Sequence, residues 1–152
     1  MSLENSFEED FHVLRMHYDQ LASEHGDTAA AVQQSSVQSQ DRRLEVLAEI
    51  GSLAGAKVLD FGCGAGRLLE VLKRKHGLPE RDYTGYDLSG NLLEFGRLKY
   101  TEARFEQRDI LVDGVGEDFD YVFISGVFNN KISNNEEFIR KTLDLLFYRV
   151  RK

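Results

Sequence analysis

Several kinds of residue are scarce or absent in this chain of 152 residues. It has one cysteine, Cys63, so an internal disulfide is excluded, and a single thiol suits a reducing compartment such as the cytoplasm. The four histidines are scattered without the spacing of metal ligands, so we expect no metal site. The chain also lacks an apolar run of membrane-spanning length and the apolar core of a signal peptide. We therefore expect a cytoplasmic protein that has no membrane partner.

Basic residues are outnumbered by acidic ones, 19 to 26, which gives a formal net charge of −7. The longest basic run, Lys73 to Lys75, falls in the last turn of a predicted helix, where cations stabilise the negative end of the dipole. Without a basic stripe, nucleic acid is disfavoured as a partner. A hydrophobic content of 41% over this length indicates one globular domain rather than a disordered chain.

The most informative segment lies between Lys57 and Glu70, with the sequence KVLDFGCGAGRLLE. A short apolar run carries one acid, Asp60, and is followed by Gly62, Gly64 and Gly66 and then by an amphipathic stretch. This pattern predicts a buried strand, a tight turn and the start of a helix. Glycines at alternate positions permit positive φ and remove the Cβ atoms that hold a ligand away. A small molecule can therefore lie directly on the main chain.

The spacing of these glycines distinguishes between ligands. A dinucleotide-binding loop reads Gly-x-Gly-x-x-Gly, whereas this loop reads Gly-x-Gly-x-Gly after Asp60, whose carboxylate suits an ammonium better than a phosphate. Here the chain resembles the class I S-adenosylmethionine-dependent methyltransferases, whose first motif matches Val58 to Gly66. The resemblance implies S-adenosyl-L-methionine as donor and S-adenosyl-L-homocysteine as product. The alternative is a glycine-rich turn that binds no ligand.

Strand and helix patterns alternate after residue 57. We predict strands over 57–61, 83–86, 103–107 and 119–125, and helices over 66–76, 89–100 and 133–150. Alternation of this kind predicts parallel βαβ units with right-handed crossovers. The expected fold is a Rossmann-like three-layer α/β/α sandwich, and the resemblance implies a strand order of 3-2-1-4. The last helix is expected to start at Ser133 and to bury Ile139, Leu143, Leu146 and Val150.

The N-terminal part, residues 1–56, is expected to be a helical cap on a core of residues 57–152. Ser6 and Glu9 form a capping-box pattern before a helix that ends at Gly26. Residues 27–40 are predicted to form a loop or weak helix that orders over a ligand. A second helix is predicted over 39–50, with Leu44, Leu47 and Ile50 facing inward.

The predicted sheet is short for the family, whose members continue with three further strands after the last helix predicted here. A fourth strand left at the edge would be apolar and unprotected. We therefore expect either a fragment of a longer protein or pairing of this edge with another chain, as in a homodimer.

Three acids, Asp60, Asp87 and Asp109, follow strands, and ligands of open α/β sheets bind beyond those strand ends. Asp87 can accept hydrogen bonds from two ribose hydroxyls, a role that acids also play in NAD-binding folds; its alternative role is to cap the next helix. The resemblance implies that Asp109 and the Ile110 amide recognise adenine, with an ordinary polar loop as the alternative. Leu88 and Ile110 would flank the adenine, or would simply belong to the core.

The remaining candidates come from the glycine loop, the segment after the fourth strand and the cap. Cys63 is expected to pack in the loop rather than to act as a nucleophile. By resemblance, Ser125 faces the sulfonium, and the cap contributes Tyr18, Gln40 and Arg43, the last either pairing with the methionine carboxylate or lying exposed. The complete set of candidate donor-binding residues is Asp60, Gly62, Cys63, Gly64, Gly66, Asp87, Leu88, Asp109, Ile110, Ser125, Tyr18 and Arg43.

The predicted reaction is an SN2 transfer of a methyl group to a small-molecule or protein acceptor. The motifs that base-methylating enzymes carry after the fourth strand, Asn/Asp-Pro-Pro-Tyr/Phe and Pro-Cys, are absent, which argues against a nucleic-acid base as acceptor. No residue stands out as a general base, so no catalytic residue is assigned. A non-catalytic donor-binding domain remains an alternative, and an NAD-dependent oxidoreductase is a weaker one because of the glycine spacing.

Overall fold

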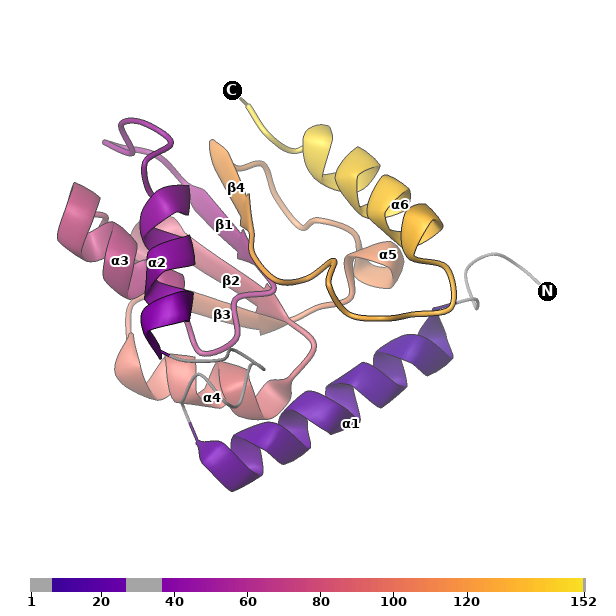
Figure 1. Ribbon diagram of the computed structural model, residues 1–152. Helices are drawn as coiled ribbons and strands as arrows, with labels where there is room; N and C mark the ends of the chain where they lie inside the picture. Colours follow the sequence, from indigo (N-terminus) through magenta and orange to yellow (C-terminus); the bar gives the residue numbers. More distant parts are fainter. Residues whose placement is uncertain (1–6, 27–36, 152) are drawn as a thin grey trace.

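The computed structural model describes residues 7–26 and 37–151. Its centre is a four-stranded parallel sheet with the order β3-β2-β1-β4, which confirms the predicted fold class and strand order (Figure 1). Because β1 is central, Asp60 lies opposite Gly85 of β2 and Phe123 of β4. The strands are β1 (Val58–Phe61), β2 (Tyr83–Asp87), β3 (Arg104–Gln107) and β4 (Tyr121–Ile124).

Helices cover both faces of the sheet (Figure 1). On one face lie α2 (Val37–Leu47), α3 (Arg67–His76) and α4 (Gly90–Lys99), whose apolar side chains pack with Val58 in one core cluster. On the other lie α5 (Ile110–Asp113) and α6 (Asn135–Phe147), which pack with Leu59 in a second cluster. The two clusters follow from the alternation of side chains along a strand, and this is why β1 is buried at every position.

The ends of the core helices follow local sequence signals. Gly66 and Gly77 flank α3 in the left-handed conformation that glycine adopts at little cost. Ser89 caps α4, and its hydroxyl accepts a hydrogen bond from the Leu92 amide at 3.2 Å, as its position before the helix predicted. A short 3-10 helix, Glu80–Asp82, leads into β2. The one-turn helix α5 was not predicted, because four residues carry no periodicity.

The N-terminal helix α1 (Glu8–His25) lies across the end of the sheet to which the strands point (Figure 1). Phe7 precedes it without a side-chain cap, and Ser6 of the predicted capping box lies outside the described residues. The rings of Phe7 and Phe11 pack against Phe138 of α6. Gly26 ends the helix, as predicted. Within the described parts of the chain, no helix is sufficiently long and apolar to cross a membrane.

Helix α2 differs from its prediction at both ends. It begins at Val37 and ends at Leu47, whereas a helix over 39–50 was expected, and residues 27–36 of the predicted loop lie outside the described residues. The prediction that Ile50 faces inward is wrong, since this residue is 55% exposed. The helix gives way to a turn before Ile50, so helical periodicity no longer determines its direction, and Ala48 takes the buried position instead.

The buried face of helix α6 agrees only in part with the prediction, which included Leu146 but also Leu143. The buried residues are Phe138, Thr142 and Leu146, whereas Leu143 is 45% exposed. The N-cap is Asn134, whose side chain accepts a hydrogen bond from the Glu137 amide at 3.1 Å. The predicted N-terminal residue, Ser133, is instead bound by α1. Apolar residues occur on most sides of this helix, so spacing alone placed Leu146 correctly but Leu143 wrongly.

The outer edge of the sheet beside β4 is not bare over its whole length. Val150, after α6, forms a parallel bridge with Phe119, just before β4. The Phe119 amide donates to the Arg149 carbonyl at 2.8 Å, and the Arg151 amide donates to the Phe119 carbonyl at 2.9 Å. The expectation of a fully unprotected edge therefore holds for β4 itself but not for the residues that lead into it.

Candidate functional site

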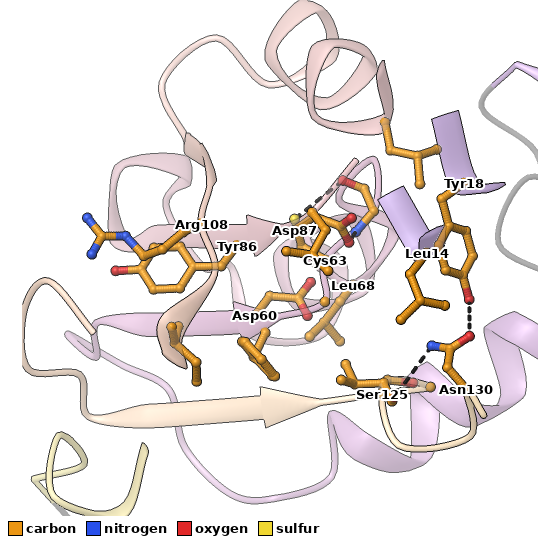
Figure 2. A pocket seen from close by; sticks show the side chains of 18 of the residues that line it. Leu14, Tyr18, Asp60, Cys63, Leu68, Tyr86, Asp87, Arg108, Ser125 and Asn130 are labelled. Carbon is orange, nitrogen blue, oxygen red and sulfur yellow. Dashed lines mark hydrogen bonds between the residues drawn. The ribbon is translucent and has the colours of Figure 1, made fainter. Parts of the chain in front are cut away.

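One pocket lies at the carboxyl ends of the strands, beneath α1 (Figure 2). All but one of the predicted donor-binding residues line it, although they come from six separate segments of the chain. Asp60, Asp87 and Ser125 contribute from the strand ends, and Leu14 and Tyr18 contribute from α1. The exception is Gly66, which begins α3 and packs against the core rather than against the pocket.

The glycine loop has no room for side chains at two of its positions. Gly62 has a φ of 78°, and a Cβ placed there would lie 2.3 Å from the Val127 Cγ2 atom. Gly66 has a φ of 86°, and a Cβ there would lie 2.8 Å from the ring of Phe105. Both angles are in the region that only glycine adopts readily. The contact of Gly62 with Val127 packs the loop against the segment after β4, and the contact of Gly66 with Phe105 packs the start of α3 against β3.

Asp87 fixes the loop from the next strand. One carboxyl oxygen accepts the Gly64 amide at 2.8 Å, and the other accepts the Ser89 amide at 2.9 Å. Burial raises the pKa of Asp87, while these backbone hydrogen bonds oppose that rise. A carboxylate accepts about four hydrogen bonds, so each oxygen keeps capacity for a ligand hydroxyl. Asp87 therefore both holds the loop and presents acceptors to the pocket.

Asp60 lies at the floor of the pocket and is 3% exposed. The Tyr83 hydroxyl donates to its carboxyl at 2.6 Å. Burial raises the pKa of Asp60 to about 7, the Tyr83 hydrogen bond counteracts part of the rise, and the negative charge of Asp87 adds to it. An uncompensated buried carboxylate is costly, so this position favours a cation brought by a ligand.

Cys63 lines the pocket, but its thiol is packed inside the loop. The sulfur donates weakly to the Gly64 carbonyl at 3.3 Å and lies so close to Gly85 that a Cβ there would be 2.6 Å away. Burial and two nearby carboxylates raise the pKa of this thiol well above its ordinary value. Because nucleophilic cysteines react as thiolates, this environment is that of a packing residue.

Asp109 and Ile110 lie at the start of α5. Asp109 is the N-cap, and its carboxyl accepts the Leu111 amide at 3.0 Å. Burial raises the pKa of Asp109, and the Leu111 hydrogen bond acts in the opposite direction. The Ile110 side chain is buried in the core. Leu88 is partly buried beside Leu111 in the pocket wall. Asp109 thus has a structural role as a cap in addition to any contact with a ligand.

A polar contact between Asn130, in the segment after β4, and Tyr18 of α1 lies at the pocket. The Tyr18 hydroxyl donates to the Asn130 Oδ1 atom at 2.7 Å, and the Asn130 Nδ2 atom donates to the Val127 carbonyl at 3.2 Å (Figure 2). Ser125 lies on the same side of the pocket. The orientation of the Asn130 amide is therefore fixed at both ends by residues that also line the pocket.

Helix α2 supplies Gln40 and Arg43 to the pocket lining, as predicted from the resemblance. Arg67, at the start of α3, donates two hydrogen bonds to the Asp41 carboxylate, at 3.0 and 3.1 Å. This paired contact holds α2 against the helix that follows the glycine loop. The cap and the loop are thus joined next to the pocket.

Sequence reasoning did not assign several residues that complete the pocket. Phe11 and Leu14 of α1 and Phe138 of α6 add apolar side chains to the pocket lining. Arg108 lies on the side of the pocket away from Leu14 (Figure 2). Arg108 stacks over the Tyr86 ring, with its guanidinium carbon 5.2 Å from the ring centroid, and no local sequence signal indicates that contact.

Comparisons with known proteins agree with this geometry. A family model described as a methyltransferase domain matches residues 59–147. A trans-aconitate 2-methyltransferase from Rhodopseudomonas palustris is 31% identical over 84 residues, which is 55% of this chain and 32% of that protein. A ribosomal RNA small subunit methyltransferase C from Pseudomonas aeruginosa is 36% identical over 70 residues, or 46% of this chain and 20% of that protein. The chain thus spans a third or less of these relatives.

Solved structures show the same fold. Magnesium protoporphyrin IX methyltransferase from Synechocystis, with bound SAM, superposes with a TM-score of 0.67 at 19% identity, covering 93% of this chain and 72% of that one. A SAM-dependent methyltransferase from Thiobacillus denitrificans, in complex with S-adenosyl-L-homocysteine, gives 0.51 at 23% identity, covering 72% and 44%. Since the family model spans more than half of the sequence, this chain belongs to the methyltransferase domain family.

Proposed function

We propose that this chain binds S-adenosylmethionine in the pocket beneath α1 and transfers its methyl group to a small-molecule or protein acceptor. The observation that carries the proposal is the contact between Asp87 and the Gly64 amide, 2.8 Å long, in a pocket that Asp60 and Asp109 also line. The glycine loop, whose main chain carries no side chains at its glycines, thus lies in one pocket with three carboxyl groups that follow separate strands. These groups match the amine, ribose and adenine of the donor.

The residues present fit that donor. Asp60 is suited to the ammonium, the free capacity of Asp87 to the ribose hydroxyls, and Asp109 with the Ile110 amide to the adenine edge. The main chain at Gly62 is accessible only because glycine has no side chain, since a Cβ there would collide with Val127. Gly64 contributes its amide, and Leu88, Cys63 and Ser125 line the pocket around it.

The bound donor supplies an activated methyl group on a sulfonium, so the protein needs no covalent intermediate. The task of the chain is alignment, and well-oriented reacting groups reach effective molarities on the order of 10⁵–10⁸ M. The segment from Ser125 to Asn130 lies where an acceptor would approach, and α1 excludes water from above. Tyr18, through its bond to Asn130, holds these two elements together.

Titration calorimetry with S-adenosylhomocysteine and with NAD tests the proposal directly. We expect saturable binding of S-adenosylhomocysteine and none of NAD at the same concentrations. Binding of NAD alone would favour the oxidoreductase alternative, which the glycine spacing disfavours. Binding of S-adenosylhomocysteine without methyl transfer to any acceptor would favour a donor-binding domain that is not catalytic.

We propose further that residues 1–56 act as a cap on a donor-binding core of residues 57–152. The contacts of Tyr18 and Arg43 with the pocket lining support this division. We also propose that the protein is cytoplasmic, since its single thiol is buried, and that two copies pair through β4, which is an edge strand. Sedimentation velocity across a concentration series tests the pairing.

A further inference from the structure

Helix α1 is tied to the core near both of its ends. Near its start, the Asp10 carboxylate accepts hydrogen bonds from the Ser133 hydroxyl at 2.5 Å and the Ser133 amide at 3.1 Å. In its second half, the Asp19 carboxylate accepts the Ser89 hydroxyl at 2.5 Å and the Asn91 amide at 3.2 Å. The helix therefore joins the start of α4 to the segment before α6 and crosses over the pocket between them.

The part of the pocket directly under this helix is apolar. Phe11 and Leu14 face it from α1, and Val127 and Phe138 face it from the other side. The edge of the Phe138 ring packs on Phe11, with centroids 5.3 Å apart. The carboxyl groups proposed to hold the donor come from the ends of β1, β2 and β3, so this wall is left for the other reactant.

None of the four described side chains of this wall carries a group that could remove a proton. Among the described residues that line the pocket, the carboxyl groups are those of Asp60, Asp87 and Asp109, and none is a histidine. The Tyr18 hydroxyl is already committed as a donor to Asn130. Burial raises the pKa of the Cys63 thiol, which makes the thiolate a poor base here.

We infer that the methyl acceptor is a small, largely apolar molecule whose attacking atom holds a lone pair at neutral pH without losing a proton, such as a carboxylate, an aromatic thiolate or a weakly basic amine. This inference rests on the proposed function. The lone pair forms the new bond to the methyl carbon, the carbon–sulfur bond breaks, and its electron pair stays on sulfur. No proton is transferred in the step. A folded protein or nucleic acid is disfavoured, because α1 is bound over the pocket at both sides.

Matched pairs of acceptors test this class. Release of S-adenosylhomocysteine is measured with octanoate against octan-1-ol, thiophenol against phenol, and N-methylaniline against benzyl alcohol. We expect octanoate, thiophenol or N-methylaniline, at least one of the three, to react at least tenfold faster than its alcohol or phenol partner. Methylation confined to the alcohols and phenols, or turnover with none of the six while S-adenosylhomocysteine still binds, overturns the inference alone. Absence of S-adenosylhomocysteine binding overturns the proposed function itself.

A pair of variants in α1 tests the place of the acceptor. Leu14→Trp fills the apolar wall, whereas Val13→Trp adds the same ring to the neighbouring position, which is 59% exposed. For the best acceptor, we expect Leu14→Trp to lower kcat/KM at least tenfold with S-adenosylhomocysteine affinity within threefold, and Val13→Trp to change neither. Unchanged acceptor kinetics in Leu14→Trp, or an equal loss of donor affinity, overturns the assignment of this wall. Thermal melts establish that both variants are folded.

Discussion

Replacing Asp60 with asparagine is expected to stabilise the folded protein at neutral and alkaline pH while weakening donor binding. In the folded chain this carboxyl is 3% exposed, and burial raises its pKa from an ordinary value of 3.8 to about 7. Ionising it therefore costs more in the folded than in the unfolded state. Asparagine has nearly the same shape, carries no charge, and its carbonyl can accept the Tyr83 hydroxyl.

The sign and size of the effect follow from linkage. The folded state holds the Asp60 proton more tightly, so wild-type stability from this group is complete below pH 4 and is lost as pH rises through about 7. A difference of about three pKa units between the folded and unfolded states corresponds to roughly 4 kcal/mol of unfolding free energy, at about 1.36 kcal/mol per unit. Asp60→Asn should therefore match the wild type near pH 4 and exceed its free energy of unfolding by up to that amount near pH 8.

Urea unfolding of the ligand-free protein at pH 5, 6, 7 and 8 measures this difference. Asp144→Asn serves as the control, because that carboxylate is exposed on α6 in an ion pair with Arg140 and should show no comparable trend. A stability difference between wild type and Asp60→Asn that is the same at pH 5 and pH 8 would refute the reasoning. In the same variant, weaker S-adenosylhomocysteine binding would show that the buried charge serves the ligand.

Three further predictions concern the loop and its supports. Asp87→Ala should weaken S-adenosylhomocysteine binding by roughly 1.5–3 kcal/mol, as expected for hydrogen bonds to a charged group, and unchanged calorimetric affinity would remove Asp87 from the site. Gly62→Ala should lower the free energy of unfolding by roughly 1–3 kcal/mol, because alanine at this position is strained at positive φ and its Cβ meets Val127. Gly55→Ala is also at positive φ but has open space around it, so it should cost less. Equal costs for the two variants would contradict the clash with Val127. Ser89→Ala should cost about 0.5–2 kcal/mol or more in urea unfolding, because it removes both the α4 cap and the hydrogen bond to Asp19, and no change would argue against both contacts.

The central part of the fold was predictable because local chemistry and tertiary structure agree there. The glycines after β1 and the serine before α4 act through neighbouring backbone, and the strand order followed from the family resemblance. Leu146 of α6 is buried as predicted, but Leu143 was mispredicted because it is also apolar, and only the packing of the complete fold shows that it is left exposed. Ile50 was mispredicted because a helix end moved by three residues.

The site was predictable at the strand ends but not at the cap contacts. Asp60, Asp87 and Asp109 stand next to recognisable strands, so the topology alone brings them together. The bond from Tyr18 to Asn130 joins positions 112 residues apart, and neither residue lies in a motif that indicates the other. Ser133 was likewise predicted to start the last helix from its local sequence alone. Its hydroxyl instead donates to Asp10, which is distant in sequence, so no local pattern indicates this contact. Such pairs depend on the complete fold.

The long reach of α1 has a consequence for how the protein is made. Asp10 leaves the ribosome 123 residues before Ser133, its partner, and Phe11 precedes Phe138 by a similar interval. At a synthesis rate of about 5–20 residues per second, the apolar side of the first helix waits roughly 6–25 s for the surface that covers it. During translation the apolar side of α1 therefore stays without its native partner until Phe138 has been synthesised.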